Sequence, residues 1–333
     1  MPAIRHRESP GWPSATSPAV HDTWGVAADL GCCGVGEAIA VAQVRYTTVV
    51  PAWTTLSVLD WTTQRFTEAG IAGARLEAQL LLARVLDCSR MQLYTGFDKP
   101  LGEQELAAYK ALIRRRLGGE PVAYLLNEQE LWGLPFFVDE NVLVPRPDTE
   151  TVIEVALKLR ADKAAPCRVL DLCTGSGAIA IALAKELTAA TVLATDVSPH
   201  ACAIARKNAE RNKLADRVEV REGDLFAPVA NERFELITAN PPYIATAVIE
   251  TLSAEVKREP RLALDGGPDG LAFYDRICDR VNDHLEPGGS LVVEHGFDQA
   301  DAVRERFERA GLADVTLIHD LGKNPRVTRG TRR

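Results

Sequence analysis

Residues 168–180 read RVLDLCTGSGAIA, and this stretch decides the fold that the chain is expected to adopt. An apolar strand pattern at 168–172 runs into a glycine-rich loop, and a helical pattern begins at Ala178. Glycines in such a loop allow a ligand to approach the backbone closely at the start of a helix. Taken as GxGxxA, the loop is a weak indication of a dinucleotide site, and a helix-capping turn without a ligand is the alternative.

Asp171 stands at the end of this strand, just before the glycines, and it favours a different ligand. A carboxylate in this place would repel a pyrophosphate but would attract an ammonium or sulfonium group. S-adenosylmethionine carries both of these cations. We therefore expect the loop to bind this cosubstrate.

Alternating strand and helix patterns continue on the carboxyl side of the loop. The strand patterns lie at 168–172, 191–194, 218–221, 234–239, 290–294 and 315–319, with helices beginning at Ala178 and Pro199. Such alternation predicts an α/β fold with a mostly parallel sheet. Ligands of these sheets bind beyond the carboxyl ends of the strands.

Polar residues follow successive strand patterns at those ends. Asp196 is placed to accept hydrogen bonds from ribose hydroxyls, although it could instead cap the helix near Pro199. Asp224 could accept from the adenine amino group, while Leu225 or Phe226 packs on the adenine ring. Four successive strand ends carry Asp171, Asp196, Asp224 and Asn240. This ordered series favours an S-adenosylmethionine site over a separate capping or turn role for each residue.

The loop Asn240-Pro241-Pro242-Tyr243 follows the strand pattern at 234–239. Two prolines fix two φ angles and remove two N–H donors, which leaves a stiff loop rich in acceptors. The Asn240 side-chain oxygen and the Pro241 carbonyl could accept both hydrogens of a planar NH2 group, with Tyr243 covering its face. In isolation an ordinary proline turn that ends a strand is the better explanation of these residues.

The amino-terminal part has different residue patterns. Residues 53–123 show helical periodicity, with Leu56, Leu59, Thr63 and Phe66 near one face, and predict a helical substrate-binding bundle. β-Branched and aromatic residues at 124–150 indicate a β-hairpin linker, which leaves 151–333 as the methyltransferase domain. Residues 1–52 are expected to be a disordered extension, with a signal peptide or an over-long start as the alternatives.

Composition narrows the classes of partner and compartment. The net charge of −8 argues against binding along nucleic-acid phosphates, and no apolar run is long enough to span a membrane. The seven cysteines form no CxxC pair, which predicts reduced thiols and a cytoplasmic location. The six histidines show no metal-ligand spacing, so no metal is expected.

Further segments show a resemblance that covers about residues 54–333. The chain resembles the protein-(glutamine-N5) methyltransferases, most closely those that modify peptide chain release factors, in LVPRPDTE at 143–150, REP at 258–260, GGPDGL at 266–271, VEHG at 293–296 and DLGKNPRV at 320–327. The resemblance implies a Rossmann-like class I methyltransferase fold with a seven-stranded, mostly parallel sheet.

The resemblance also implies roles for individual residues. The residues implied to line the cofactor are Cys173, Thr174, Gly175, Ser176, Gly177, Asp196, Leu225 and Asn240. Asp171 and Asp224 are added to this set because of their positions at the ends of strand patterns. The residues implied to hold a substrate glutamine are Asn240, Pro241, Pro242 and Tyr243. Cys173, Leu225 and Asn127 depart from the commonest residues of the family, glycine, an aromatic residue and glycine, which bears on affinity rather than on reaction type.

These inferences together predict methyl transfer from S-adenosylmethionine to the side-chain nitrogen of the glutamine in the Gly-Gly-Gln motif of release factors. Asn240 and Pro241 would act by aligning the amide nitrogen with the sulfonium methyl, without a strong general base. The alternatives are glutamine methylation of a ribosomal protein, adenine-N6 methylation of nucleic acid, and cofactor binding without catalysis. We expect a monomer that binds release factors and neither nucleic acid nor membranes.

Two further charged residues keep open alternatives. Glu294 would either shape the pocket or form a structural ion pair. Arg146 would either anchor the hairpin or meet the substrate backbone. Neither is expected to be catalytic.

Overall fold

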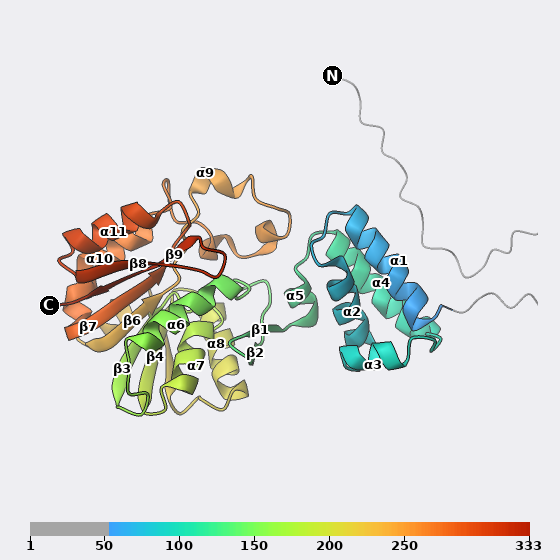
Figure 1. The fold of residues 1–333 in the computed structure, drawn as a ribbon, viewed down its shortest axis with the longest axis horizontal. Coiled ribbons are helices and arrows are strands. Elements are labelled where there is room, and N and C mark those ends of the chain that lie inside the picture. The colour runs from blue at the N-terminus through green and yellow to red at the C-terminus, as the bar shows by residue number, and fades with distance from the viewer. Residues whose placement is uncertain (1–52) are drawn as a thin grey trace, which may run out of the picture.

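The computed structural model describes residues 53–333, so the expectation for residues 1–52 lies outside the described residues. The first five helices gather at one end of an elongated molecule, and the sheet with the later helices lies at the other (Figure 1). The helices of the first part are α1 (Thr55–Glu68), α2 (Ala74–Val85), α3 (Arg90–Thr95), α4 (Glu103–Leu117) and α5 (Val122–Leu126). The first begins with a capping box, in which Thr54 and Ser57 satisfy each other's backbone N–H groups.

The buried face of α1 differs from the expected one at two of the four predicted positions. Leu59 and Phe66 are buried as predicted, but Leu56 is 41% exposed and Thr63 is only partly buried. The buried positions of the helix recur at helical spacing and are Thr55, Val58, Leu59, Thr62 and Phe66. Threonine side chains complete this face because the Thr62 hydroxyl donates to the Val58 carbonyl, 2.8 Å away.

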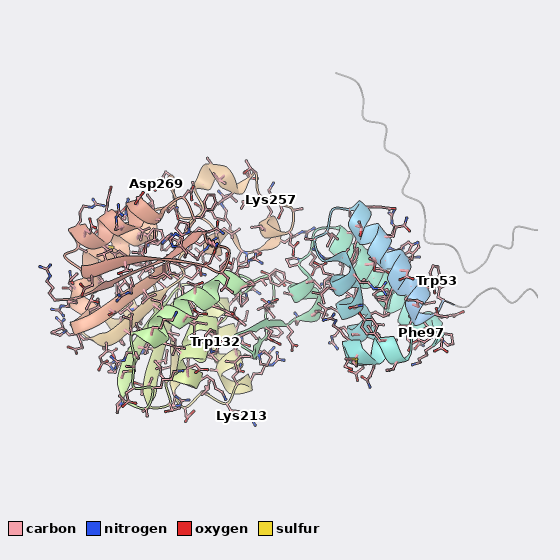
Figure 2. The ribbon with its side chains drawn as sticks, in the orientation of Figure 1. Trp53, Phe97, Trp132, Lys213, Lys257 and Asp269 are labelled. Atoms are coloured by element: carbon pink, nitrogen blue, oxygen red, sulfur yellow. The ribbon has the colours of Figure 1, made fainter. Side chains whose placement is uncertain are left out.

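A two-stranded antiparallel hairpin, β1 (Gln129–Leu131) and β2 (Leu134–Phe136), connects the helices to the sheet. Its turn places Trp132 and Gly133 at φ 53° and 66°, the backbone of a tight type I′ turn. Trp132, labelled in Figure 2, has two polar contacts that hold this unusual conformation. Its backbone N–H donates to Glu150 over 2.8 Å and its indole N–H to Glu186 over 3.1 Å.

The carboxyl-terminal part holds a sheet of order β5-β4-β3-β6-β7-β9-β8, which confirms the predicted fold class. Its strands are β3 (Cys167–Leu172), β4 (Ala190–Asp196), β5 (Val218–Glu222), β6 (Phe234–Ala239), β7 (Leu285–Glu294), β8 (Ala313–His319) and β9 (Pro325–Thr331). The first five of these strands are parallel, and β9 pairs antiparallel with both β7 and β8. β9 was not predicted as a strand.

Helices cover both faces of this sheet (Figure 1). The remaining helices are α6 (Glu150–Lys158), α7 (Ala178–Glu186), α8 (Pro199–Arg211), α9 (Thr246–Ile249), α10 (Ala272–His284) and α11 (Ala300–Arg309), and the short 3₁₀ turns are η1 (Pro147–Thr149), η2 (Ala227–Val229), η3 (Val256–Arg258) and η4 (Arg261–Ala263). Along β3, Val169 belongs to the hydrophobic cluster that contains residues of α6, α7 and α8, whereas Leu170 and Leu172 belong to the cluster that contains residues of α10 and α11. This alternation follows from the two-residue period of a strand.

The segment around η3 contacts the helical part, and Figure 2 shows Lys257 on its side facing that part. Arg116 at the end of α4 is buried and pairs with Glu77 of α2 over 2.6 Å and with Glu255 over 2.8 Å. Arg258 adds a hydrogen bond to the Gly118 carbonyl over 3.2 Å. One buried guanidinium therefore joins the bundle to a loop of the sheet domain. Within residues 53–333, no helix has both the length and the apolar content that crossing a bilayer requires.

Candidate active site

Strand register brings the predicted site residues to one edge of the sheet. Leu172 pairs with Thr195 on one side and with Ala239 on the other, and Ala239 pairs with Val293. Because these strands are parallel, the residues that come directly after these paired positions lie side by side, namely Cys173, Asp196, Asn240 and Glu294. The strand that follows β3 in sequence, β4, lies on one side of β3, and β6 lies on the other side, so the strand order reverses here. α/β sheets bind their ligands at such switch points.

Asp171 supports the glycine loop from behind. It is fully buried, and its carboxylate accepts hydrogen bonds from the Thr174 hydroxyl over 2.6 Å and the Thr238 hydroxyl over 2.8 Å. Burial raises the pKa of Asp171 to about 7, against the effect of these two donors. Its side chain therefore fixes the loop between β3 and β6.

Asp196 closes the loop from the neighbouring strand. One carboxylate oxygen accepts from the Gly175 N–H over 2.8 Å, and the other accepts from the Ser198 N–H over 2.9 Å. Burial raises the pKa of Asp196, and the backbone donors of Ser198 and Gly175 oppose that shift. The helix start at Pro199 is capped by Ser198, whose hydroxyl accepts from Ala201, so Asp196 is not needed as that cap.

A cleft of about 990 Å³, counted with its open mouth, lies beside this loop. Its walls combine acceptors with apolar side chains, which suits a ligand with a sugar and a flat ring. Among the predicted site residues, those that line it are Cys173, Thr174, Gly175, Ser176, Asp196, Asp224, Leu225, Asn240 and Pro242. Residues that line it without having been predicted include Leu143, Thr149, Val197, Leu262 and Phe273.

Four predicted residues are absent from that lining: Asp171, Gly177, Pro241 and Tyr243. Gly177 has a φ of 82°, and a Cβ there would lie 3.1 Å from Ile181 and 3.2 Å from Ala205. It therefore permits close packing of α7 on α8. Tyr243 is partly buried, and the loss of solvent around its hydroxyl, together with the nearby Glu294, raises its pKa to about 12.

All three departures from the family pattern occupy left-handed backbone. Cys173 has a φ of 55° and Asn127 a φ of 52°, a region that glycine adopts without strain and asparagine tolerates. Burial raises the pKa of Cys173 well above its ordinary value, with Asp196 and Asp171 adding to the shift, so the thiol stays protonated. Leu225, at φ 47°, is buried, and its carbonyl accepts from the Thr195 hydroxyl over 3.1 Å.

Asp224 is exposed at the cleft and pairs with Arg276.

The Asn240 side chain has a defined orientation. Its amide nitrogen donates to the Thr149 hydroxyl oxygen, 3.3 Å away, which leaves the amide oxygen as the end free to accept. Thr149 belongs to the 143–150 segment and is buried. The sequence pattern of that segment did not predict a role for Thr149.

Behind the NPPY loop lies the glycine-rich segment 266–270. A Cβ on Gly266 would lie 2.8 Å from the Pro242 carbonyl oxygen, and one on Gly270 would overlap the Tyr243 carbonyl oxygen. Gln299 donates from its side chain to that same Tyr243 carbonyl over 2.8 Å. Only glycines permit the backbone of the NPPY loop to rest this closely, and Gln299 was missed because no local pattern marks it.

The other quoted segments meet around the same loop. Arg326 of β9 pairs with Asp148 over 3.2 Å and donates to the His295 carbonyl over 3.3 Å. Arg146 pairs with the buried Glu259, so it anchors its own segment. Glu294 is buried beside Thr149 and Asn240 and forms no ion pair within residues 53–333.

Asn208 was also missed by sequence reasoning. It is fully buried on α8, where it accepts from the Phe137 N–H over 2.6 Å and donates to the Phe137 carbonyl over 3.0 Å. It donates also to the Ser176 carbonyl over 2.8 Å. One side chain thus joins the linker to the glycine loop. Among the residues that the structure describes, no group of three or more His, Cys, Asp or Glu side chains could hold a metal ion.

Two family models match the chain. The PrmC N-terminal domain matches residues 57–126, and the methyltransferase small domain matches residues 155–259. The first range falls on the helical part, and the second covers strands β3 to β6 with the glycine loop and the NPPY loop.

Curated relatives match over most of their length. The release factor glutamine methyltransferase of Geobacter sulfurreducens is 48% identical over 279 residues, which are 84% of this chain and 96% of the relative. That of Rhodopirellula baltica is 40% identical, over 83% of this chain and 95% of the relative. Among solved structures, the hMettl16 catalytic domain in complex with a MAT2A 3′UTR hairpin has a TM-score of 0.51 at 18% identity, over 72% of this chain and 84% of that chain, which supports the fold alone.

Proposed function

The chain belongs to the release factor glutamine methyltransferases, and we propose that it methylates the side-chain nitrogen of the glutamine in the Gly-Gly-Gln motif of peptide chain release factors. S-adenosylmethionine supplies a methyl group made electrophilic by its sulfonium. The glutamine nitrogen forms the new N–C bond as the S–C bond breaks, the sulfur keeps that electron pair, and one amide proton passes to water. The chain's own residues have to bind both substrates and orient the amide.

The cleft fits S-adenosylmethionine by the chemistry of its lining. Asp196 supplies carboxylate oxygens for the ribose hydroxyls, and Leu225 and Phe273 supply apolar surface for the adenine. Residues 173–176 bring backbone and small side chains close to the methionine part. Asp171 and Gly177 act from behind the loop by holding its shape, and Asp224 lies at the rim beside Arg276.

The orientation of Asn240 carries the proposal for the acceptor. Because its nitrogen is engaged by Thr149, its oxygen is available to accept one N–H of a glutamine amide, and the Pro241 carbonyl accepts the other. Pro242 lines the cleft and Tyr243 packs behind it, so both hold the amide plane. Alignment of this kind lowers a barrier by roughly 7 to 11 kcal/mol, which makes a strong base unnecessary.

The proposed partner is a release factor, met in the cytoplasm by a monomeric enzyme. Relatives whose names state this substrate support the partner, and segments 143–150 and 320–327, which meet at the Arg326–Asp148 pair, flank the amide site.

The deciding experiment offers labelled S-adenosylmethionine to the enzyme with a purified release factor, a ribosomal protein extract and a DNA duplex in separate reactions. Mass mapping then identifies the modified residue. We expect label only on the glutamine of the Gly-Gly-Gln tripeptide. Label on a ribosomal protein or on adenine, with none on the release factor, would replace the proposed substrate.

A further inference from the structure

Glu294 ends β7 directly beside Asn240, because Ala239 and Val293 are paired in parallel strands. Its side chain is 1% exposed, and its Oε2 atom has no hydrogen-bond partner among the described residues. A buried carboxyl oxygen without a donor is costly, so such a group needs a reason. The Thr149 hydroxyl and the Asn240 amide are the polar groups that lie against it.

We propose that Glu294 is a positioning residue, which sets the orientation of the Asn240 amide through the Thr149 hydroxyl. Thr149 accepts from the Asn240 nitrogen, so its own proton must go to another acceptor. An ionised Glu294 can only accept, which fixes the direction of the chain as Asn240 to Thr149 to Glu294. The Asn240 oxygen is then presented to the substrate. This inference rests on the proposed function.

Protonation of Glu294 would remove that direction. A neutral carboxyl can donate to the Thr149 hydroxyl, which can then donate to the Asn240 oxygen and turn the amide over. The amide would then present its NH2 group to the NH2 group of the glutamine, and two donors cannot bond. Methyl transfer would be lost without any change at the cofactor loop.

The charges around Glu294 place this change within reach of ordinary pH. Burial raises the pKa of Glu294 to about 7, opposed by Thr149 and by Arg326 of β9, while Asp148 adds to the shift. Tyr243 of the NPPY loop also faces the carboxyl, and Tyr274 of α10 donates to the Glu294 backbone carbonyl over 2.9 Å. Both tyrosines have pKa values raised by burial, so they stay neutral across this range.

The first test is the pH profile of kcat for wild type, Glu294→Gln and Glu286→Gln, at saturating cofactor and release factor. The amide introduced by Glu294→Gln would offer both a donor and an acceptor, so we expect kcat at about pH 8 to fall at least tenfold, a loss of about 1.4 kcal/mol. The wild-type decline below about pH 7 should disappear in this variant, with cofactor Kd within about twofold. Glu286→Gln, on the same strand but away from the site, should keep the wild-type profile.

Thr149→Val and Thr149→Ser provide a second route that leaves β7 intact. In Thr149→Val, kcat should fall and its dependence on pH below about 7 should disappear. Thr149→Ser keeps the hydroxyl, so both the kcat and the pH dependence should resemble those of the wild type. The proposal is overturned if Glu294→Gln keeps the wild-type kcat and profile, or if Thr149→Val does so.

A measurement without substrate separates this inference from the proposed function. The side-chain amide signals of Asn240, followed by nitrogen NMR in the cofactor-bound enzyme, should shift with pH in wild type and remain constant in Glu294→Gln. Absence of turnover in every variant, wild type included, would reject the release factor as substrate, and the NMR titration would still decide the role of Glu294. Identical titrations in the two proteins would overturn the inference.

Discussion

The side-chain nitrogen of Asn240 lies 3.3 Å from the hydroxyl oxygen of Thr149 and donates a hydrogen bond to it. The two residues are far apart in sequence and belong to the NPPY loop and the 143–150 segment. Thr149 is 4% exposed, so water competes little for this bond. The acceptor end of Asn240 is therefore determined by a second segment of the chain, and changes in either segment should affect the same step.

Replacing Asn240 with Ala should strongly reduce turnover while cofactor binding stays measurable. The variant loses the acceptor that orients the amide, and the loss of one preorganised hydrogen bond at a reacting centre typically costs about 10² to 10³ in kcat. Single-turnover methylation of a release factor fragment measures the rate, and calorimetry measures cofactor affinity. Methylation that persists near the wild-type rate would refute the role assigned to Asn240.

Gly270→Ala should also reduce kcat, through the position of the NPPY loop. The new Cβ would overlap the Tyr243 carbonyl oxygen and lie 2.6 Å from the Gln299 nitrogen. Gly288→Ala is the matched control, because both glycines have a φ of 77° but nothing lies within 4 Å of a Cβ at Gly288. Both variants should lose about 1 kcal/mol of stability from the backbone, and only Gly270→Ala should lose activity. Equal activity in the two variants would contradict the contact argument.

The site residues at the strand ends could be predicted from sequence because the glycine loop and the alternating patterns are local. The contacts that other segments make with these residues could not be predicted. Thr149 and Glu294 reach Asn240 only through the strand order and the path of the linker, and no spacing in the sequence contains that information. Gln299 likewise acts on a backbone carbonyl 56 residues away.

β9 escaped prediction for a different reason. Its sequence, PRVTRGT at 325–331, carries a proline, two arginines and a glycine in place of alternating apolar residues. The glycine is required by packing, since a Cβ on Gly330 would lie 2.9 Å from Phe307. The strand is held by its two neighbours rather than by its own propensity. Leu56 illustrates the same limit in α1, where the buried face is completed by threonines.

Replacing Asp196 with Ala should weaken cofactor binding more than it slows chemistry. The carboxylate is proposed to bind the ribose and also holds the Gly175 and Ser198 N–H groups. Hydrogen bonds to a charged group contribute about 1.5 to 3 kcal/mol, so Kd should rise roughly 10- to 150-fold. Glu222→Gln, at the end of the adjacent strand, serves as the control and should leave Kd unchanged. Calorimetric titration with S-adenosylhomocysteine provides the measurement.

Arg116→Met should destabilise the fold, because it leaves Glu77 without its partner in a largely buried site. Breaking a buried ion pair costs about 3 to 5 kcal/mol, whereas a partly exposed pair contributes about 1 kcal/mol or less. Glu255→Gln removes the partner whose side chain is 37% exposed, so its cost should be the smaller one. Denaturant unfolding compares the two variants, and a larger loss in Glu255→Gln would contradict the assignment.

Two buried carboxyls with strongly raised pKa values, Asp171 and Glu294, should each lower the stability of the fold as the pH rises from about 4.5 to 7. Burial also raises the pKa values of Asp196 and Glu259, which act in the same direction, and lowers the pKa values of His284 and His295, which act against it. Asp171 and Glu294 have ordinary values of 3.8 and 4.5, and burial raises each to about 7 in the folded protein. Within this window the folded protein keeps both protons while the unfolded chain has lost them. Raising the pH therefore stabilises the unfolded state relative to the folded one, and the free energy of unfolding falls. Each group contributes up to about 1.4 kcal/mol per pH unit, and the decline ends above about pH 7.

Carboxyls with lowered pKa values, such as Asp265 and Asp320, act in the opposite direction. Their stabilisation is lost only as the pH falls through their folded values, below the window of the buried pair. Glu294→Gln should therefore remove the part of the decline due to Glu294 between about pH 5 and 7 and leave the contributions of the other groups unchanged. Denaturant unfolding at several pH values measures the two slopes, with Glu286→Gln as the control. Parallel slopes in wild type and Glu294→Gln would show that Glu294 does not hold its proton in the folded protein.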